Sequence, residues 1–219
     1  MPQVRMIGIT QPNVTNTDCV TAEELIAYAA RVSNPGNQNN NETAPKLLAY
    51  LAKNKHWSPF EMVHVVMEIT TTRDIARQIL RHRSFSFQEF SQRYAVATDF
   101  EISDARLQDT KNRQNSIETN DDFLIDDWHL AQDEVVTLVK KRYTEFLERG
   151  MAKEVARKIL PEGLTSSGMY MSGSVRSWIH YCQERRKVGV QKEHRQVAQW
   201  CNELLLEHFP SLKEILNDT

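Results

Sequence analysis

Glycine is scarce in this sequence, and no glycine-rich phosphate loop is present. Only seven of the 219 residues are glycine, and neither G-x-G-x-x-G nor G-x-x-x-x-G-K-[ST] occurs. Both loops need glycine where the backbone approaches a phosphate. A Rossmann or P-loop nucleotide site is therefore not expected.

Cysteine is also scarce. Cys19, Cys182 and Cys201 are an odd number, with no C-x-x-C spacing and no histidine at a zinc-finger interval, so neither a disulfide framework nor a structural metal site is expected. We expect three reduced, mostly buried thiols. A metal hydrolase built on His56, His64 and Glu61 is disfavoured, because no ligand pair has the i,i+4 spacing of a helical metal site. The chain is predicted to bind no metal.

Long apolar runs and an excess of positive charge are both missing. The longest runs, such as Leu25–Ala30, are far shorter than the roughly 20 residues that cross a bilayer, and the polar N-terminus lacks a signal-peptide core. Lys and Arg number 27 against 29 Asp and Glu, a net charge of -2. No general field draws such a protein to nucleic acid or anionic lipid. We expect a cytoplasmic protein with neither nucleic acid nor membrane as partner.

Apolar residues make up 40% of the chain, enough for one domain with its own core. A capping-box spacing at Thr21 and Glu24 predicts a helix to about Val32, and alternation over 63–70 predicts a strand. No repeat or linker divides the chain, so residues 1–219 are predicted to form a single α+β domain. The polar segment 108–122 is expected to be an exposed excursion and a candidate lid. The other expected helices begin at Thr43 or span about 72–82, 126–149 (closed by Gly150), 152–160, 175–186 and 191–209, with further strand patterns at 100–102 and 170–174.

Three arginines are spaced four residues apart in the most informative segment. Arg73, Arg77 and Arg81 share one face of the predicted helix, where like charges repel by a few tenths of a kcal/mol per pair. Something negative should offset them. A phosphorylated ligand is one candidate, because the guanidinium fork binds phosphate bidentately; a surface salt-bridge ladder using Asp74 and Glu68 is the other.

The segment that follows places hydrogen-bonding groups between aromatic residues. Phe85, Phe87 and Phe90 alternate with Ser, Gln and Glu over 84–94, and polar groups there could address a base edge. We expect the aromatic rings to anchor a loop to the core. An alternative function is a single-stranded nucleic-acid-binding module that uses the arginine-rich helix and this segment, although the net charge argues against it.

Several motifs of the sequence, taken together, resemble those of a known family. The run Arg81-His82-Arg83 through Tyr94 resembles the R-H-R-x-x-S-x-x-x-x-S-x-R-Y signature of flavin-dependent thymidylate synthases. Long signatures of this kind are specific, and the other matching elements occur in the family's order. Those elements are His56-x-Ser58-Pro59-Phe60-Glu61, Ala156-Arg157-x-x-Leu160-Pro161 and the stretch from Arg176 through Arg185 to Gln191-x-Glu193.

The resemblance implies a fold, an assembly and a reaction. It implies a mixed sheet flanked by helices and a homotetramer, with FAD and substrate bound where subunits meet. It implies the reductive methylation of dUMP to dTMP, with the methylene from methylenetetrahydrofolate and reducing equivalents from NADPH through the flavin. The thymidylate synthases of the other family use a cysteine nucleophile, which the cysteine pattern here does not support.

The resemblance also assigns residues. Arg185 matches the arginine that activates the uracil ring; a fixed cation beside N3 and O2 would favour the ionised pyrimidine, although a cation near a helix C-terminus is the plainer interpretation. His82 could otherwise be an interface histidine and His180 a core one. Ser91 has no recognisable base beside it, so it is expected to bind and not to attack. The nucleotide-binding positions are Gln78, Ile79, Leu80, Arg81, Glu89, Phe90, Ser91, Gln92, Arg93, Arg157 and Arg185, and the flavin-binding positions are Ser58, Arg81, His82, Arg83, Glu89, Ser174, Val175, Arg176 and His180.

Four positions depart from the family pattern. Met62 and Gly189 stand where many relatives have histidine, and Ser174 and His180 stand where others carry Asn. These departures concern individual flavin contacts and leave the nucleotide arginines unchanged.

Overall fold

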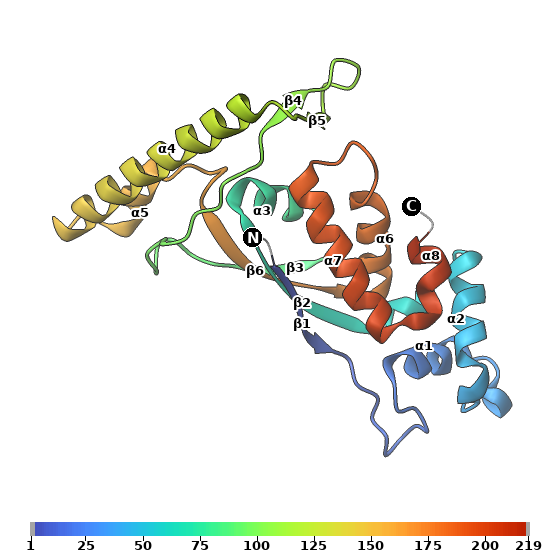
Figure 1. Ribbon diagram of the computed structural model, residues 1–219. Helices are drawn as coiled ribbons and strands as arrows, with labels where there is room; N and C mark the ends of the chain where they lie inside the picture. The colour runs from blue at the N-terminus through green and yellow to red at the C-terminus, as the bar shows by residue number, and fades with distance from the viewer. Residues whose placement is uncertain (1–2, 218–219) are drawn as a thin grey trace.

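The computed structural model describes residues 3–217, which form an α+β structure around one antiparallel sheet (Figure 1). The four strands lie in the order β1-β2-β6-β3, and each runs opposite to its neighbours. The α+β class is confirmed, but the expected mixed sheet is wrong, because no parallel pair occurs among the described strands. The strands are β1 (Gln3–Ile9), β2 (His64–Thr72), β6 (Ser166–Ser174) and β3 (Ser86–Glu89).

Among the described residues, helices cover one face of this sheet. On β2, the predicted strand, Val65, Met67 and Ile69 are fully buried, whereas the residues between them are partly accessible. Tyr170 on β6 is 46% exposed on the uncovered face. Alternation of this kind is expected of an antiparallel sheet with one packed and one open face.

Helices pack against the covered face (Figure 1). The predicted capping box is present: Thr21 accepts from the backbone of Glu24, whose side chain accepts from the backbone of Thr21. Thr43 precedes the second helix but makes no capping bond, because its hydroxyl accepts from Arg31. Trp178 and Tyr181 are the largest side chains of the core that these helices form. The helices are α1 (Ala22–Ala30), α2 (Ala44–Lys53), α6 (Val175–Arg185), α7 (Lys192–His208) and α8 (Lys213–Asn217).

The family signature follows a short helix and contains a strand. Helix α3 (Arg73–Ile79) ends three residues before the predicted end, and β3 follows where a loop was expected. Phe85 and Phe87 both pack against the core. Their two-residue spacing thus reflects strand alternation, which the loop interpretation overlooked.

A helical arm projects from this body (Figure 1). Helix α4 (Asp122–Glu148) is the predicted long helix, and Gly150 behind it has φ 85°, as a C-terminal glycine should. Its apolar stripe is exposed only in part: Leu130 and Leu138 are 58% and 57% accessible, whereas Tyr143 is buried. The short α5 (Lys153–Ala156) follows, and the predicted helix 152–160 continues only as a 3-10 turn at 157–159.

The polar excursion is a hairpin at the base of the arm. Strands β4 (Arg106–Gln108) and β5 (Ser116–Glu118) pair antiparallel across it. Lys192 of α7 reaches the hairpin and bonds to Asp104 and Glu118 at 2.8 and 2.9 Å. The expected strand at 100–102 amounts to one isolated bridge, from Phe100 to Thr165.

Candidate active site

Arg185 lies at the centre of one group of predicted site residues. It is the last residue of α6, and its Nε donates a hydrogen bond to Nε2 of His82 over 2.8 Å. His82 follows α3, and its ring packs edge-on against Tyr181 with 5.0 Å between ring centroids. The structure thus brings together the arginine predicted to act on the pyrimidine and a histidine predicted to contact flavin.

Two histidines beside Arg185 are kept neutral. Burial, followed by the charge of Arg185, lowers the pKa of His82 to about 4. The same two causes lower the pKa of His194, which is fully buried on α7, to about 3. Near pH 7 neither ring is charged, so the positive charge of this group comes from arginine.

Gln78 on α3 is held at both ends of its amide. Its Nε2 donates to Oε1 of Gln191 over 2.7 Å, and its Oε1 lies 3.3 Å from Nδ1 of His194. Sequence reasoning missed His194; its one signal is its place directly after the Gln191-x-Glu193 element. Within residues 3–217 the buried Tyr181 hydroxyl and His194 Nε2 have no hydrogen-bond partner.

Two arginines of α3 form ion pairs with residues distant in sequence. Arg73 lies 3.4 Å from Glu89, a predicted ligand-binding residue that also accepts a hydrogen bond from Ser167. Arg77 pairs with Glu162. Protein carboxylates therefore offset two of the three stacked charges.

The ladder expected through Asp74 and Glu68 is wrong. Glu68 pairs with Arg5 of the adjacent strand, and Asp74 accepts a hydrogen bond from the Thr72 hydroxyl. Both carboxylates are occupied by partners that helical i,i+4 spacing cannot reveal.

A third group contains flavin-binding candidates at the N-terminus of α6. Glu61 accepts a hydrogen bond from Ser174 at 2.6 Å and one from Arg176 at 2.7 Å. The Ser174 bond, ahead of the Arg176 contacts, lowers the pKa of the Glu61 carboxyl. Ser174 also caps α6 by accepting from the backbone of Ser177, so serine here fills the capping role that asparagine could fill elsewhere. Ser58 begins the short turn that carries Glu61.

The end of the signature lies beside the arm. Arg93 is 3.2 Å from Glu154, next to α5, and Ser91 Oγ accepts weakly from the backbone of Arg93 at 3.4 Å. In the part of the chain that the structure describes, no titratable side chain bonds to Ser91. This geometry agrees with the interpretation of Ser91 as a binding residue.

Several predicted positions turn their side chains away from any open site. Ile79 and Val175 are fully buried in the core, and Gln92 is 4% exposed. Only the backbone of the first two could meet a ligand. Phe90 lines a different pocket, near Phe100. Leu80 is half-buried, packed against the core, whereas His180 is exposed, so its interpretation as a core histidine is wrong.

Three arginines of the matched motifs have no carboxylate partner. Across the described residues, Arg81, Arg83 and Arg157 form no ion pair, and the side-chain hydrogen bond of Arg185 goes to neutral His82. Unpaired guanidinium groups suit phosphate and other anions. This donor set fits a ligand rich in phosphate, as FAD and a nucleotide both are.

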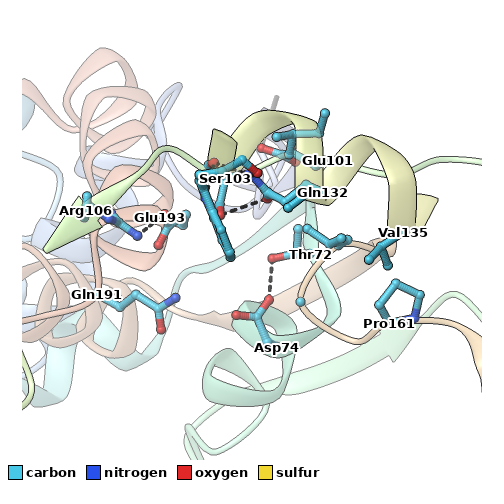
Figure 2. Close-up of a pocket in the computed structure, with 15 residues that line it drawn as sticks. Thr72, Asp74, Glu101, Ser103, Arg106, Gln132, Val135, Pro161, Gln191 and Glu193 are labelled. Atoms are coloured by element: carbon cyan, nitrogen blue, oxygen red, sulfur yellow. Dashed lines mark hydrogen bonds and ion pairs between the residues drawn. The ribbon is translucent and has the colours of Figure 1, made fainter. Parts of the chain in front are cut away.

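A pocket lies next to these groups and not among them. Figure 2 shows this cavity of about 450 Å³ between α4 and the starts of α3 and α7, with Gln132 of α4 on its wall. Arg106 and Glu193 form an ion pair at its edge, 2.5 Å apart. None of the predicted site residues lines it, but Gln191 does, and this side chain bonds to Gln78.

Residues 3–217 show neither a metal cluster nor a membrane-spanning helix. These residues contain no cluster of three or more His, Cys, Asp or Glu side chains arranged to hold a metal ion. None of their helices is both long and apolar enough to cross a bilayer. All three cysteines are unpaired and buried, as predicted.

The fold places the chain in a known structural class. A UMP/dUMP methylase from Streptomyces cacaoi, solved with 5-Br dUMP, superposes with a TM-score of 0.81 over 99% of this chain and 95% of its own, at 23% sequence identity. The family model of the thymidylate synthase complementing protein matches residues 16–211.

Close relatives then specify the family. The chain is 48% identical over 214 residues to a probable flavin-dependent thymidylate synthase of Paramecium bursaria Chlorella virus 1, covering 97% of this chain and 98% of the relative. It is 49% identical to the flavin-dependent thymidylate synthase of Synechocystis, again over 97% of this chain and 98% of the relative. The chain belongs to the flavin-dependent thymidylate synthase family, as the signature predicted, and the enzyme interpretation is favoured over the nucleic-acid-binding alternative.

Proposed function

We propose that this protein methylates dUMP to dTMP, with FAD as cofactor, methylenetetrahydrofolate as carbon donor and NADPH as reductant. The observation that carries the proposal is a set of arginines in the matched motifs, Arg81, Arg83 and Arg157, that form no ion pair with a carboxylate among the described residues. Arg185, from the same motifs, bonds to neutral His82. Membership of the family supports the flavin, and the folate and NADPH parts rest on that membership.

Different residues of the chain are assigned to the pyrimidine, to the phosphate of the nucleotide and to the flavin. Arg185 presents a permanent cation to the pyrimidine edge, which stabilises negative charge on the ring without any proton transfer by the side chain. Gln78, whose amide is already oriented, binds the nucleotide beside it, and Ser91, Arg93 and Arg157 bind its phosphate. Bound FAD would supply the hydride. Arg81, Arg83 and the Ser174–Arg176 turn would hold its phosphates and ring.

We further propose that the site is completed by self-association into a homotetramer. The candidate groups are held in separate places on one chain, and both the open face of the sheet and part of the apolar stripe of α4 are accessible. An exposed apolar stripe of this kind marks a protein interface. The reduced, buried thiols support a cytoplasmic location.

The test is a flavin spectrum followed by a tritium-release assay. Purified protein should absorb as a flavoprotein, and it should release tritium from C5 of labelled dUMP only with folate and NADPH present. A protein that neither holds flavin nor releases tritium would contradict the proposed function.

A further inference from the structure

One hydrogen bond, made by Nε, orients the guanidinium of Arg185. Its Nε donates to Nε2 of His82, and no other side-chain bond to Arg185 is found in the part of the chain described. A long side chain at the last residue of a helix would otherwise sample several rotamers. The direction in which this cation points therefore depends on His82.

The His82 ring is itself fixed. It lies edge-on to Tyr181 and to Phe85, at centroid distances of 5.0 and 6.4 Å. Both of those rings pack edge-on against Trp178, which is fully buried. Interlocked aromatic rings leave little rotational freedom, so the acceptor nitrogen stays in place.

The protonation state is the one this bond requires. Burial and the Arg185 charge lower the pKa of His82 to about 4, so the ring is neutral at working pH. Arg185 must donate at Nε2, which places the single ring proton on Nδ1. A cationic histidine could not accept this bond.

We propose that His82 is a positioning residue for Arg185, which aims the terminal nitrogens of the guanidinium at the pyrimidine edge. A guanidinium offers two paired edges, one that uses Nε and one formed by the two terminal nitrogens. The bond to His82 occupies the first, so a ligand meets the second. This inference rests on the proposed function, and it gives His82 a role distinct from the flavin contact that the resemblance implies.

The variant His82→Phe tests this role, since it keeps an aromatic ring but removes the acceptor. We expect tritium release to fall roughly ten- to hundredfold, the usual cost of losing an orienting hydrogen bond, with flavin occupancy close to that of the parent. His82→Gln restores an acceptor and should recover most of this loss. Thermal unfolding of both variants checks that the fold is intact.

A double-mutant cycle separates positioning from other effects. Arg185→Lys lacks Nε, so adding His82→Phe to it should cause no further loss, whereas His82→Phe added to Arg157→Lys should be additive. Additivity with Arg185→Lys would overturn the proposal. So would a His82→Phe protein whose turnover returns to the parent's value once FAD is saturating.

The same set of single and double variants is also compared by dUMP affinity, which calorimetry measures on the purified proteins. If the parent binds dUMP but releases no tritium, the proposed reaction fails, while non-additive affinities still support positioning. If the parent is active and both affinity and turnover are additive, positioning fails and the reaction stands.

Discussion

Gly173 and Phe85 are so close that the glycine can carry no side chain. A Cβ built on Gly173 of β6 would lie 2.5 Å from Cδ1 of the Phe85 ring. That ring contacts His82 and rests on Trp178 at a centroid distance of 4.8 Å. The missing side chain at Gly173 thus leaves the space in which Phe85 packs, and Phe85 supports the aromatic cluster next to His82 and Arg185.

Gly173→Ala should therefore destabilise the fold and disturb the site. We expect an unfolding free energy lower by about 1–3 kcal/mol, because the ring must move from a packed position, together with lower turnover. Urea denaturation and tritium release measure the two effects. Gly168→Ala on the same strand is the matched control, since nothing lies within 4 Å of its added Cβ; equal losses in both variants would refute the steric explanation.

Arg185→Lys should keep the fold and the flavin but lose most turnover. An ammonium is a point charge and does not reproduce a planar contact through two donors. Steady-state kinetics beside a flavin spectrum would show this, with Arg142→Lys on the exposed arm as control. Unchanged kinetics would remove Arg185 from the mechanism.

Ser91→Ala should still form dTMP at a measurable rate. The hydroxyl has no base bonded to it among the described residues, so it is expected to bind phosphate and not to attack carbon. Product analysis checks this prediction. A covalent nucleotide adduct trapped on Ser91 of the parent would overturn it.

Stability should fall as the solution becomes acidic, in part because of His194. Its folded-state pKa of about 3 is below the ordinary 6.5, so between these values the unfolded chain binds a proton that the folded chain does not. Its contribution is complete above pH 6.5 and declines below it, by about 2 kcal/mol between pH 7 and pH 5. Denaturation curves of His194→Gln should show a shallower pH dependence, while His129→Gln on the exposed arm should match the parent.

Flavin retention should depend on assembly. Leu138→Glu changes an exposed side chain of α4, so it should leave the single chain folded while it disrupts any interface made by the stripe. Light scattering beside flavin fluorescence should show dissociation together with release of FAD, and Thr137→Glu, at an exposed polar position, should show neither. A monomer that retains stoichiometric flavin would contradict the shared site.

The elements that could be predicted were those with local signals. The capping box at Thr21 and the alternation along β2 depend only on residues close together in the sequence, and both predictions were confirmed. Strand β1 was not predicted, although Val4 and Met6 alternate with polar Gln3 and Arg5, because the alternation breaks down at Ile7 and Gly8. Strand β3 was missed because a two-residue aromatic spacing also suits an anchored loop.

The site was predictable only as a set of residues. The family resemblance identified Gln78, His82 and Arg185 but not the bonds that these side chains make, because those bonds join α3 and the residues after it to α6 and to the start of α7. Which arginine meets a protein carboxylate is likewise decided by the tertiary fold, as the pairing of Arg77 with Glu162 shows. His194 lies just outside the Gln191-x-Glu193 element, and only the tertiary fold shows that it is buried.

The rate at which the three thiols are alkylated should report how often the structure opens. Burial raises the pKa of Cys19, Cys182 and Cys201, so in the folded chain each is both shielded and protonated, and alkylating reagents act on the thiolate. Modification must await an opening of the structure. Cys182 and Cys201, on neighbouring helices of the core, would record its global opening, and Cys19, ahead of α1, would record the loosening of the N-terminal segment.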